Sequence, residues 1–312
     1  MEDYVSVIML TYNREKLVGD AVKSVLDQTY KNFELIIIDN GSTDSSGFIC
    51  DEWAGKDKRI RCFHTEKNSI GKGRNIGLEN AVGKYITFVD DDDVADPIML
   101  EYLVNIIKTG DYDISMCGSV RESDGNIENK YVFEGYKSFS GVECVKELLK
   151  RELFNSANPT KLFKKGLFDD IRYEETGKYD DISVMYKIYA KAEKVVAGGR
   201  PLYTFRRHVG NNSGFTTNKK MITPDQLKEY LKAFHQRTEY LSKCFPEEKD
   251  FFLYQELSYM ISMCKSIKEY ELKSCENEYL IMFRVIKENL NILYLCPWLK
   301  QGEKEYLDVC FR

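Results

Sequence analysis

Short β-branched apolar runs alternate with amphipathic segments along the first part of the chain. This alternation is typical of a mainly parallel sheet whose faces are covered by helices. The apolar runs predict strands at residues 5–10, 34–39, 61–64, 84–89 and 113–116. The amphipathic segments predict helices at residues 17–26, 45–55 and 72–82, and another helix begins at Pro97, because proline suits a first helical turn. We therefore expect an α/β fold.

The pattern changes twice farther along the chain. Turn residues are frequent from 121 to 141, which favours a lid or an excursion from the sheet. Residues 141–152 and 181–192 then predict helices, and residues 202–206 predict a strand. Beyond about Thr216 the chain is rich in Leu, Tyr, Phe, Lys and Glu with few Gly or Pro, which predicts about three helices. We therefore expect a domain of residues 1–215 and a helical C-terminal region of residues 216–312.

The amino-acid composition limits which binding partners and which cellular compartment we expect. The 312 residues carry a formal net charge of -5, so a nucleic acid partner is not expected, because such binding relies on clustered basic residues. The 9 cysteines are odd in number, scattered and without a CxxC pair, as in a reduced cytoplasmic protein. The acidic start lacks the features of a secretory signal, and no apolar run is long enough for a transmembrane helix. Membrane contact is expected to be peripheral.

Three polar clusters follow the predicted strands. In open α/β sheets ligands bind beyond the carboxyl ends of the strands, so these clusters should converge on one edge. Their members are Thr11, Tyr12 and Asn13, then Asp39, Asn40, Gly41 and Ser42, then Asp90, Asp91, Asp92 and Asp93.

The strongest chemical signal is the run of four aspartates after the apolar strand that ends at Val89. Crowded like charges are tolerated chiefly in water or beside a cation. Asp90 and Asp92 are two residues apart and, in an extended chain, point to the same side, where their oxygens suit Mg²⁺ or Mn²⁺. The alternative is a solvated acidic turn that caps the helix beginning at Pro97.

The other two clusters are weaker signals. The ring of Tyr12 can stack on a base, and the oxygens of Asp39 and Asn40 can accept hydrogen bonds from a base or ribose. The alternative is a pair of ordinary turns, with Asn13 capping the next helix. The glycine-rich stretch from Gly71 to Gly77 lacks the dinucleotide-binding order of glycines. It predicts a helix N-terminus that faces phosphate together with Arg74, or else a solvated cationic turn.

These residues together amount to a resemblance. The chain is similar, in the order and spacing of VSVIMLTYNREKLVGDAVKSVLDQTYKNFELIIIDNGSTDSS and GKGRNIGLENAVGKYITFVDDDD, to the family 2 inverting glycosyltransferases of GT-A fold, over roughly residues 5–213. The resemblance implies Mn²⁺ or Mg²⁺ at Asp90 and Asp92, with Asp92 as the direct ligand. It implies that a nucleotide sugar contacts the residues Thr11, Tyr12, Asn13, Asp39, Asn40, Arg74 and Asp91.

The resemblance extends to the middle of the chain. The segment Tyr179-Asp180-Asp181-Ile182 resembles the family's acidic pair at a helix start, usually Glu-Asp, and the resemblance implies that Asp181 is the catalytic base. The alternative is that both carboxylates are N-terminal charges that interact with the helix dipole. His208 follows a strand that resembles the one closing the donor site, and would bind the diphosphate or complete the metal shell. The segment from Asn158 to Phe163 resembles the acceptor side. The resemblance implies a nucleotide diphosphate sugar as donor, in the first place a UDP-sugar. The family usually has a second aspartate where this chain has Asn40, which makes the choice of UDP less secure.

The resemblance implies one reaction and leaves alternatives open. Asp181 would take the proton of an acceptor hydroxyl, while the metal and Arg74 stabilise the departing diphosphate and the anomeric carbon inverts. The alternatives are nucleotidyl transfer and a non-catalytic nucleotide-sugar-binding protein. The resemblance points to cell-surface polysaccharide synthesis with a saccharide or lipid-linked saccharide acceptor. The helical region, with Trp298, would dock on a membrane, or else serve packing or a homodimer.

Overall fold

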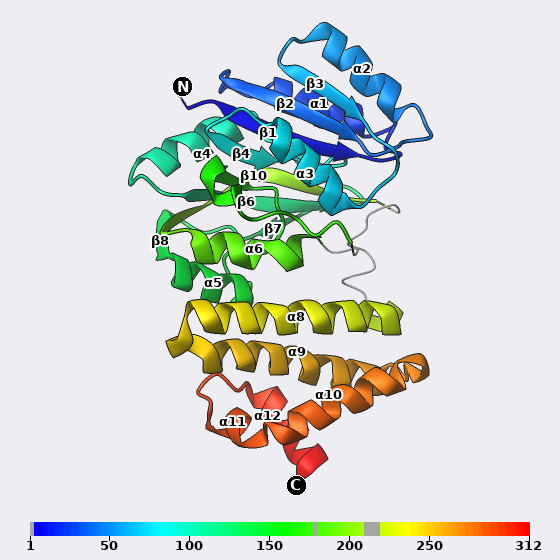
Figure 1. Ribbon diagram of the computed structural model, residues 1–312, viewed down its shortest axis with the longest axis vertical. Helices are drawn as coiled ribbons and strands as arrows, with labels where there is room; N and C mark the ends of the chain where they lie inside the picture. Colours follow the sequence, from blue (N-terminus) through cyan, green and yellow to red (C-terminus); the bar gives the residue numbers. More distant parts are fainter. Residues whose placement is uncertain (1–2, 177–179, 209–218) are drawn as a thin grey trace. The chain divides into compact units, whose positions relative to one another are not determined.

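The computed structural model describes residues 3–176, 180–208 and 219–312. The chain divides into two compact units, Met1–His208 and Val209–Arg312 (Figure 1). The boundary that the sequence predicts near residue 215 falls outside the described residues.

One ten-stranded sheet with helices on its faces forms the described part of the first unit. Its strands are β1 (Val5–Thr11), β2 (Phe33–Asp39), β3 (Ile60–His64), β4 (Tyr85–Phe88), β5 (Val94–Ala95), β6 (Ile114–Ser123), β7 (Asn126–Lys130), β8 (Tyr136–Ser140), β9 (Lys161–Lys164) and β10 (Lys194–Arg207). Its α-helices are α1 (Val18–Leu26), α2 (Ser46–Lys56), α3 (Ile70–Asn80), α4 (Met99–Lys108), α5 (Gly141–Lys150) and α6 (Asp180–Lys191). The predicted α/β class with flanking helices is confirmed.

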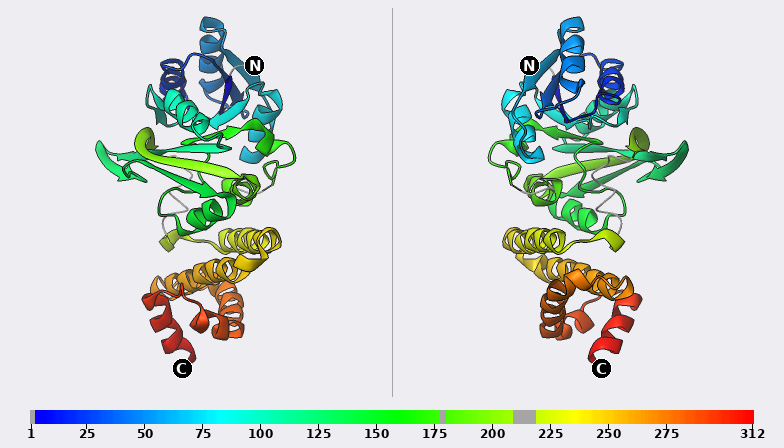
Figure 2. Two further views of the ribbon diagram at one scale, coloured as in Figure 1. Left: turned by 90° about the vertical axis from the view of Figure 1, so that its left-hand side faces the viewer. Right: turned by 90° about the vertical axis from the view of Figure 1, so that its right-hand side faces the viewer.

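The N-terminal half of the sheet is parallel, as predicted. Its strands lie in the order β3-β2-β1-β4, and β1 and β2 are buried along nearly their whole length. Helices α1, α2 and α4 share one hydrophobic core with one face of these strands. Helix α3 covers the other face, as Figure 2 shows. A Cβ atom on Gly77 of α3 would lie 2.5 Å from Ile8 of β1, so glycine is required for this close packing.

The other half of the sheet is mixed. Strand β9 lies between β4 and β6 and is antiparallel to both. Its first three residues belong to the predicted acceptor-side segment, where the sequence pattern predicts no strand. Strand β10 is longer than the predicted 202–206 and pairs in parallel with β6 and antiparallel with β5 and β8.

The predicted lid at 121–141 is wrong for most of its length. Strand β6 continues to Ser123 and turns back at Asp124 and Gly125 into β7, which pairs antiparallel with it. Both turn residues have positive φ, 50° and 79°, as a tight hairpin turn requires. The side chains of β7 are mostly exposed and polar, so backbone pairing holds this strand rather than apolar burial.

The second unit is helical. Its described residues form α8 (Pro224–Cys244), α9 (Lys249–Glu269), α10 (Glu276–Glu288), α11 (Leu290–Leu295) and α12 (Gln301–Phe311), and α9 contacts the other four. This is more than the three helices expected. Trp298 packs 5.1 Å from the ring of Phe251 inside this unit. Across the parts of the chain that the structure describes, we find no helix with the length and hydrophobicity to cross a bilayer.

Candidate functional site

Three strand ends meet at one edge of the sheet. Strand β1 lies between β2 and β4, and all three run in the same direction. Thr11 is paired with Asp39 in the register, and the backbone N–H of Asn40 donates to the Thr11 carbonyl at 2.9 Å. The polar clusters that follow β1, β2 and β4 are therefore neighbours, as the sequence predicts.

The segment after β1 is bound to the turn after β2. Asn13 has a positive φ of 52°, and its Oδ1 accepts a hydrogen bond from the backbone N–H of Thr43 at 2.8 Å. Its own N–H donates to Ser42 Oγ at 3.1 Å. Asn13 does not cap α1, because that helix begins only at Val18. The side chain instead fixes the two loops against each other.

Tyr12 connects this segment to the aspartates after β4. Its backbone N–H donates to Asp91 Oδ2 at 3.2 Å. The ammonium group of Lys67 lies 4.6 Å from the centre of the Tyr12 ring, a cation–π contact.

Asp39 is buried and held by two donors. Its Oδ1 accepts from the Ser42 backbone N–H at 3.0 Å, and its Oδ2 lies 3.0 Å from His64 Nδ1. The hydrogen bonds from His64 to Asp39 and then to Asp51 raise the pKa of His64 to about 9. The carboxylate orientation at the end of β2 is thus fixed without a ligand.

Asn40 is engaged at both ends of its side-chain amide. Its Nδ2 donates to the Asn68 carbonyl at 3.0 Å, and its Oδ1 accepts from Thr65 Oγ1 at 3.3 Å. Only 6% of the residue is exposed. A base that bound Asn40 through its oxygen would share that atom with Thr65.

The four aspartates after β4 form a turn rather than an extended segment. Strand β4 ends at Phe88, and the Asp93 backbone N–H lies 3.3 Å from the Asp90 carbonyl. Asp93 points inward, where its Oδ1 accepts from the Arg206 backbone N–H at 2.9 Å. The premise that Asp90 and Asp92 are side by side in an extended chain is therefore wrong, because the chain turns between them.

Burial and crowding change the chemistry of these carboxyl groups. Desolvation, followed by the charge of Asp92, raises the pKa of Asp90 to about 6 against the opposing charge of Arg74. The same two causes raise the pKa of Asp91 to about 7. The Asp90 side chain is nevertheless 37% exposed, so a ligand from solvent can reach it. A bound cation would relieve the repulsion within this cluster.

Asp92 is surrounded by basic side chains. Its Oδ2 lies 2.9 Å from His208 Nε2 and 3.7 Å from Arg14 Nε. Arg14 also lies 3.8 Å from Asp91. His208 follows the end of β10, so the structure brings the predicted closing residue to the predicted metal ligand.

Arg74 links three elements of the fold. Its Nε donates to Asp180 Oδ2 at 2.6 Å, and its Nη2 lies 3.5 Å from Asp90 Oδ1. The guanidinium group also lies over the rings of Phe88 and Tyr173, at 5.2 and 5.8 Å. Only 8% of the residue is exposed. Arg74 therefore holds the start of α6 beside the aspartate turn.

Asp181 follows the ion-paired Asp180 at the start of α6. Its Oδ2 accepts from Ser156 Oγ at 2.8 Å, and its Oδ1 accepts from the backbone N–H of Ile182 at 2.9 Å. Desolvation, and then the charge of Asp180, raise the pKa of Asp181 above that of an ordinary aspartate. The first residue of the predicted motif, Tyr179, lies outside the described residues.

Three basic or polar residues were not identified from the sequence. Arg14 lies at the aspartates and follows directly on the Thr11-Tyr12-Asn13 run, so its position was a usable signal. Ser156 contacts Asp181 and carried no signal. Lys161 on β9 is completely buried, its Nζ donates to the carbonyls of Ala157 and Pro159, and burial lowers its pKa to about 8. Lys161 thus stabilises the loop before β9.

The aspartate turn fits a metal ion only as an incomplete site. Among the described residues, the set of side chains whose donor atoms already lie close enough together for an ion is Asp51, Cys62 and His64, on α2 and β3. Mg²⁺ and similar ions usually take one or two carboxylates and complete their shell with water and substrate phosphates. The carboxylates of Asp90, which is 37% exposed, and Asp92, which is 14% exposed, are therefore compatible with such an ion.

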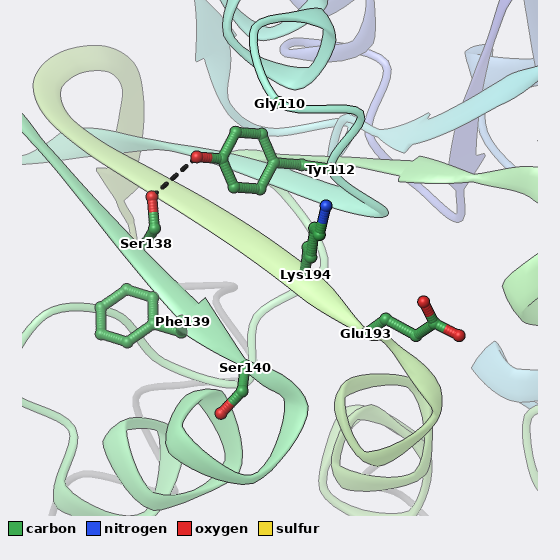
Figure 3. Close-up of a pocket in the computed structure, with 7 residues that line it drawn as sticks. All are labelled: Gly110, Tyr112, Ser138, Phe139, Ser140, Glu193 and Lys194. Carbon is green, nitrogen blue, oxygen red and sulfur yellow. Dashed lines mark hydrogen bonds between the residues drawn. The ribbon is translucent and has the colours of Figure 1, made fainter.

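A surface pocket lies elsewhere on the first unit (Figure 3). It is lined by Gly110, Tyr112, Ser138, Phe139, Ser140, Glu193 and Lys194. Tyr112 and Lys194 lie at the starts of β6 and β10, whereas the aspartate turn follows the end of β4, which runs in the same direction as β6. The pocket contains none of the predicted site residues.

Comparison with known proteins identifies the family. The model of the family described as glycosyl transferase family 2 matches residues 6–172. Glycosyltransferase GlyG of Streptococcus pneumoniae serotype 4 is 36% identical over 227 residues, which cover 68% of this chain and 73% of that protein. Two further relatives are much longer, and the chain covers 41% and 44% of their lengths.

Solved structures show the same fold. Staphylococcus aureus TarS 1–349, solved in complex with UDP-GlcNAc, has a TM-score of 0.64 and 18% identity over 92% of this chain and 91% of that chain. The mannosyltransferase PcManGT from Pyrobaculum calidifontis, solved with GDP-Man and Mn²⁺, has a TM-score of 0.51 and 14% identity over 90% and 86%. The chain belongs to glycosyl transferase family 2, has a GT-A fold and is a glycosyltransferase.

Proposed function

We propose that this glycosyltransferase is inverting and metal-dependent, and that it moves a sugar from a nucleotide diphosphate sugar to an acceptor hydroxyl with Asp181 as base. The observation that carries the proposal is the double contact of Arg74, which reaches both Asp90 and Asp180. The aspartate turn and the start of α6, which carries Asp181, therefore both lie beside one guanidinium group. Sugar transfer of this kind needs both within reach of one donor.

Asp181 supports general base catalysis. An acceptor hydroxyl is a weak nucleophile, and a carboxylate that takes its proton during attack contributes about 10²- to 10⁴-fold in rate. Its raised pKa makes Asp181 a stronger base than an exposed aspartate. Ser156 and the Ile182 amide fix its orientation. Attack from the face opposite the leaving diphosphate inverts the anomeric carbon, and no covalent sugar–enzyme bond is needed.

The departing nucleotide diphosphate would bind at the aspartate turn. Mn²⁺ or Mg²⁺ held by Asp92, with Asp90, would supply positive charge for the departing diphosphate. Arg74 holds Asp90 and α6 in place and adds a fixed positive charge close by. His208, beside Asp92, would orient that carboxylate or contact the diphosphate.

A UDP-sugar is the donor that we propose to test first. TarS has been solved with UDP-GlcNAc, and Asn40 Oδ1 can accept from the imide N–H of uracil while it keeps its bond to Thr65. Thr11, Tyr12, Asn13, Asp39 and Asp91 would surround the nucleoside and its phosphates. The acceptor would be a saccharide or lipid-linked saccharide in cell-surface polysaccharide synthesis.

The experiment is a panel of nucleotide sugars read by thermal shift with and without Mn²⁺. A donor at 100 times its dissociation constant should stabilise the protein by about 2.7 kcal/mol. We expect a UDP-sugar to raise the melting temperature in the presence of Mn²⁺ and to do much less after chelation. Equal shifts with and without Mn²⁺ would contradict the proposed metal dependence, and a shift with GDP-sugars alone would contradict the choice of UDP.

The raised pKa of Asp181 predicts an acid limb in the pH profile. Since the base must be ionised, kcat at saturating donor and Mn²⁺ should fall as pH is lowered through a pKa above 3.8, and should be level above it. The Ser156 hydroxyl favours the ionised form, so Ser156→Ala should move this limb to higher pH. Measurement of kcat against pH for both proteins checks this. Superimposed limbs would mean that another group controls the profile.

We also propose that residues 216–312 form a region separate from a catalytic domain of residues 1–215. This C-terminal region would make peripheral contact with the inner face of the membrane. Trp298 is packed in its core, so the exposed apolar side chains Leu280, Ile281, Leu295 and Val309 are the better candidates for contact. The alternative is a homodimer contact. Liposome co-sedimentation that survives deletion of residues 219–312 would remove the membrane proposal.

A further inference from the structure

Helix α2 packs against strand β3 (Figure 1). Together they carry three side chains of types that bind metals. Cys62 and His64 are two residues apart on β3, so they lie on one face of the strand. Asp51 of α2 packs over that face. His64 Nε2 lies 2.9 Å from Asp51 Oδ1 and 3.7 Å from Cys62 Sγ, and the three donor atoms all lie within 4.8 Å of one another.

We propose that Asp51, Cys62 and His64 bind a thiophilic divalent cation of the Zn²⁺ type, and that the ion links α2 to β3. This site is separate from the aspartate turn after β4. The thiolate and imidazole donors favour a softer ion than the carboxylates at that turn.

The distances agree with a tetrahedral zinc site. With Zn–S near 2.3 Å and Zn–N and Zn–O near 2.0 to 2.2 Å, tetrahedral ligands lie about 3.6 Å apart for S and N and about 3.4 Å apart for N and O. The distances in the protein are 3.7 Å and 2.9 Å. The two distances from His64 would therefore change by about half an ångström or less on binding. The donor atoms of Asp51 and Cys62 lie within 4.8 Å of each other and would need to be about 3.6 Å apart, and water would take the fourth position.

The surroundings of His64 also fit a metal ligand. Its Nδ1 lies 3.0 Å from Asp39 Oδ2, the carboxylate contact that commonly holds a ligating histidine in one orientation and leaves Nε2 for the metal. The close approach of α2 that makes this possible depends on Gly47. A Cβ atom there would lie 2.6 Å from Asp39 Oδ2.

Cys62 is accessible to an ion. Its side chain is partly exposed, and its sulfur lies 3.7 Å from His64 Nε2. The other two ligands are open to solvent, since the side chains of Asp51 and His64 are 59% and 45% exposed. An ion can therefore enter, and it takes the place of the proton that His64 Nε2 shares with Asp51.

The test is a Co²⁺ titration of the metal-free full-length protein, because a thiolate ligand gives Co²⁺ a charge-transfer absorbance that carboxylates do not. We expect the band in the parent protein and its loss in Cys62→Ser. Cys244→Ser is the matched control, since Cys244 is an exposed thiol of the second unit and should leave the band unchanged. Asp92→Asn should also leave it unchanged, which separates this site from the proposed catalytic ion.

A second variant guards against a folding defect in Cys62→Ser. Asp51 is exposed, so Asp51→Ala should fold normally, yet Co²⁺ should bind at least about tenfold more weakly. Competition by Zn²⁺ should abolish the band in the parent protein. Absence of a thiolate band in the parent, or a band unaffected by both variants, would overturn the proposal and leave His64 as a bridge between Asp39 and Asp51 only.

Discussion

Asp181→Asn should lower kcat by about 10²- to 10⁴-fold while donor binding stays nearly intact. The amide cannot take the proton of the acceptor hydroxyl, but it is the same size as the carboxylate. Its oxygen can still accept from the Ile182 backbone N–H, its NH₂ group can donate to the Ser156 hydroxyl, and Asp180 keeps the ion pair with Arg74. Burial raises the pKa of the Asp181 carboxyl group, so removal of its charge should not destabilise the fold. Steady-state rates with the donor found in the panel, together with thermal shift by that donor, measure both effects.

The matched control is Asp169→Asn. Asp169 is an exposed aspartate in the same unit, near the segment that leads into α6, and it lies outside the proposed site. Its variant should keep the parent kcat. Full turnover in Asp181→Asn, or an equal loss in both variants, would reject the assignment of the base.

Asp92→Asn should weaken Mn²⁺-dependent donor binding. Loss of a residue that merely supports a metal ligand typically costs 10- to 100-fold in affinity, so loss of the direct ligand should cost at least about that much. Binding of the donor without Mn²⁺ should change little, because the nucleoside contacts proposed for Tyr12, Asp39 and Asn40 remain. Isothermal titration with the donor, with and without Mn²⁺, gives both affinities.

Asp27→Asn serves as the control for this variant. Asp27 is an exposed carboxylate at the end of α1 whose partner is Lys23, so its loss removes the same charge away from the site. It should keep the parent response to Mn²⁺. If Asp92→Asn kept that response as well, the metal would have to bind elsewhere. The proposal that Asp92 holds the metal while Asp181 acts as the base would then be rejected.

The parallel half of the sheet could be predicted from the sequence because its strands β1 and β2 are buried on both faces. Strands β1 and β2 are nearly continuous apolar runs, and a continuous run is a strong signal. Strand β9 could not be found this way, since Lys161 and Lys164 flank only two apolar residues. The burial of Lys161 is a tertiary effect, and three neighbouring backbone and hydroxyl oxygens make it tolerable.

The β6–β7 hairpin was missed although a signal was present. Asp124-Gly125 is a frequent pair in tight hairpin turns, and the polar character of β7 obscured it. In the site, the strand-end rule predicted that Thr11, Asp39 and the aspartates lie together. It could not predict the partners of Arg74, because Asp180 is more than a hundred residues away along the chain.

The most direct test of the central claim is a crystal structure with Mn²⁺ and UDP, read by anomalous scattering from the metal. We expect an ion bound to Asp92 and to a diphosphate oxygen, with the Asp181 carboxylate on the same side of the sheet and facing the space where the sugar would extend. Density for the ion only at Asp51, Cys62 and His64, or UDP bound with no metal contact to Asp92, would contradict it.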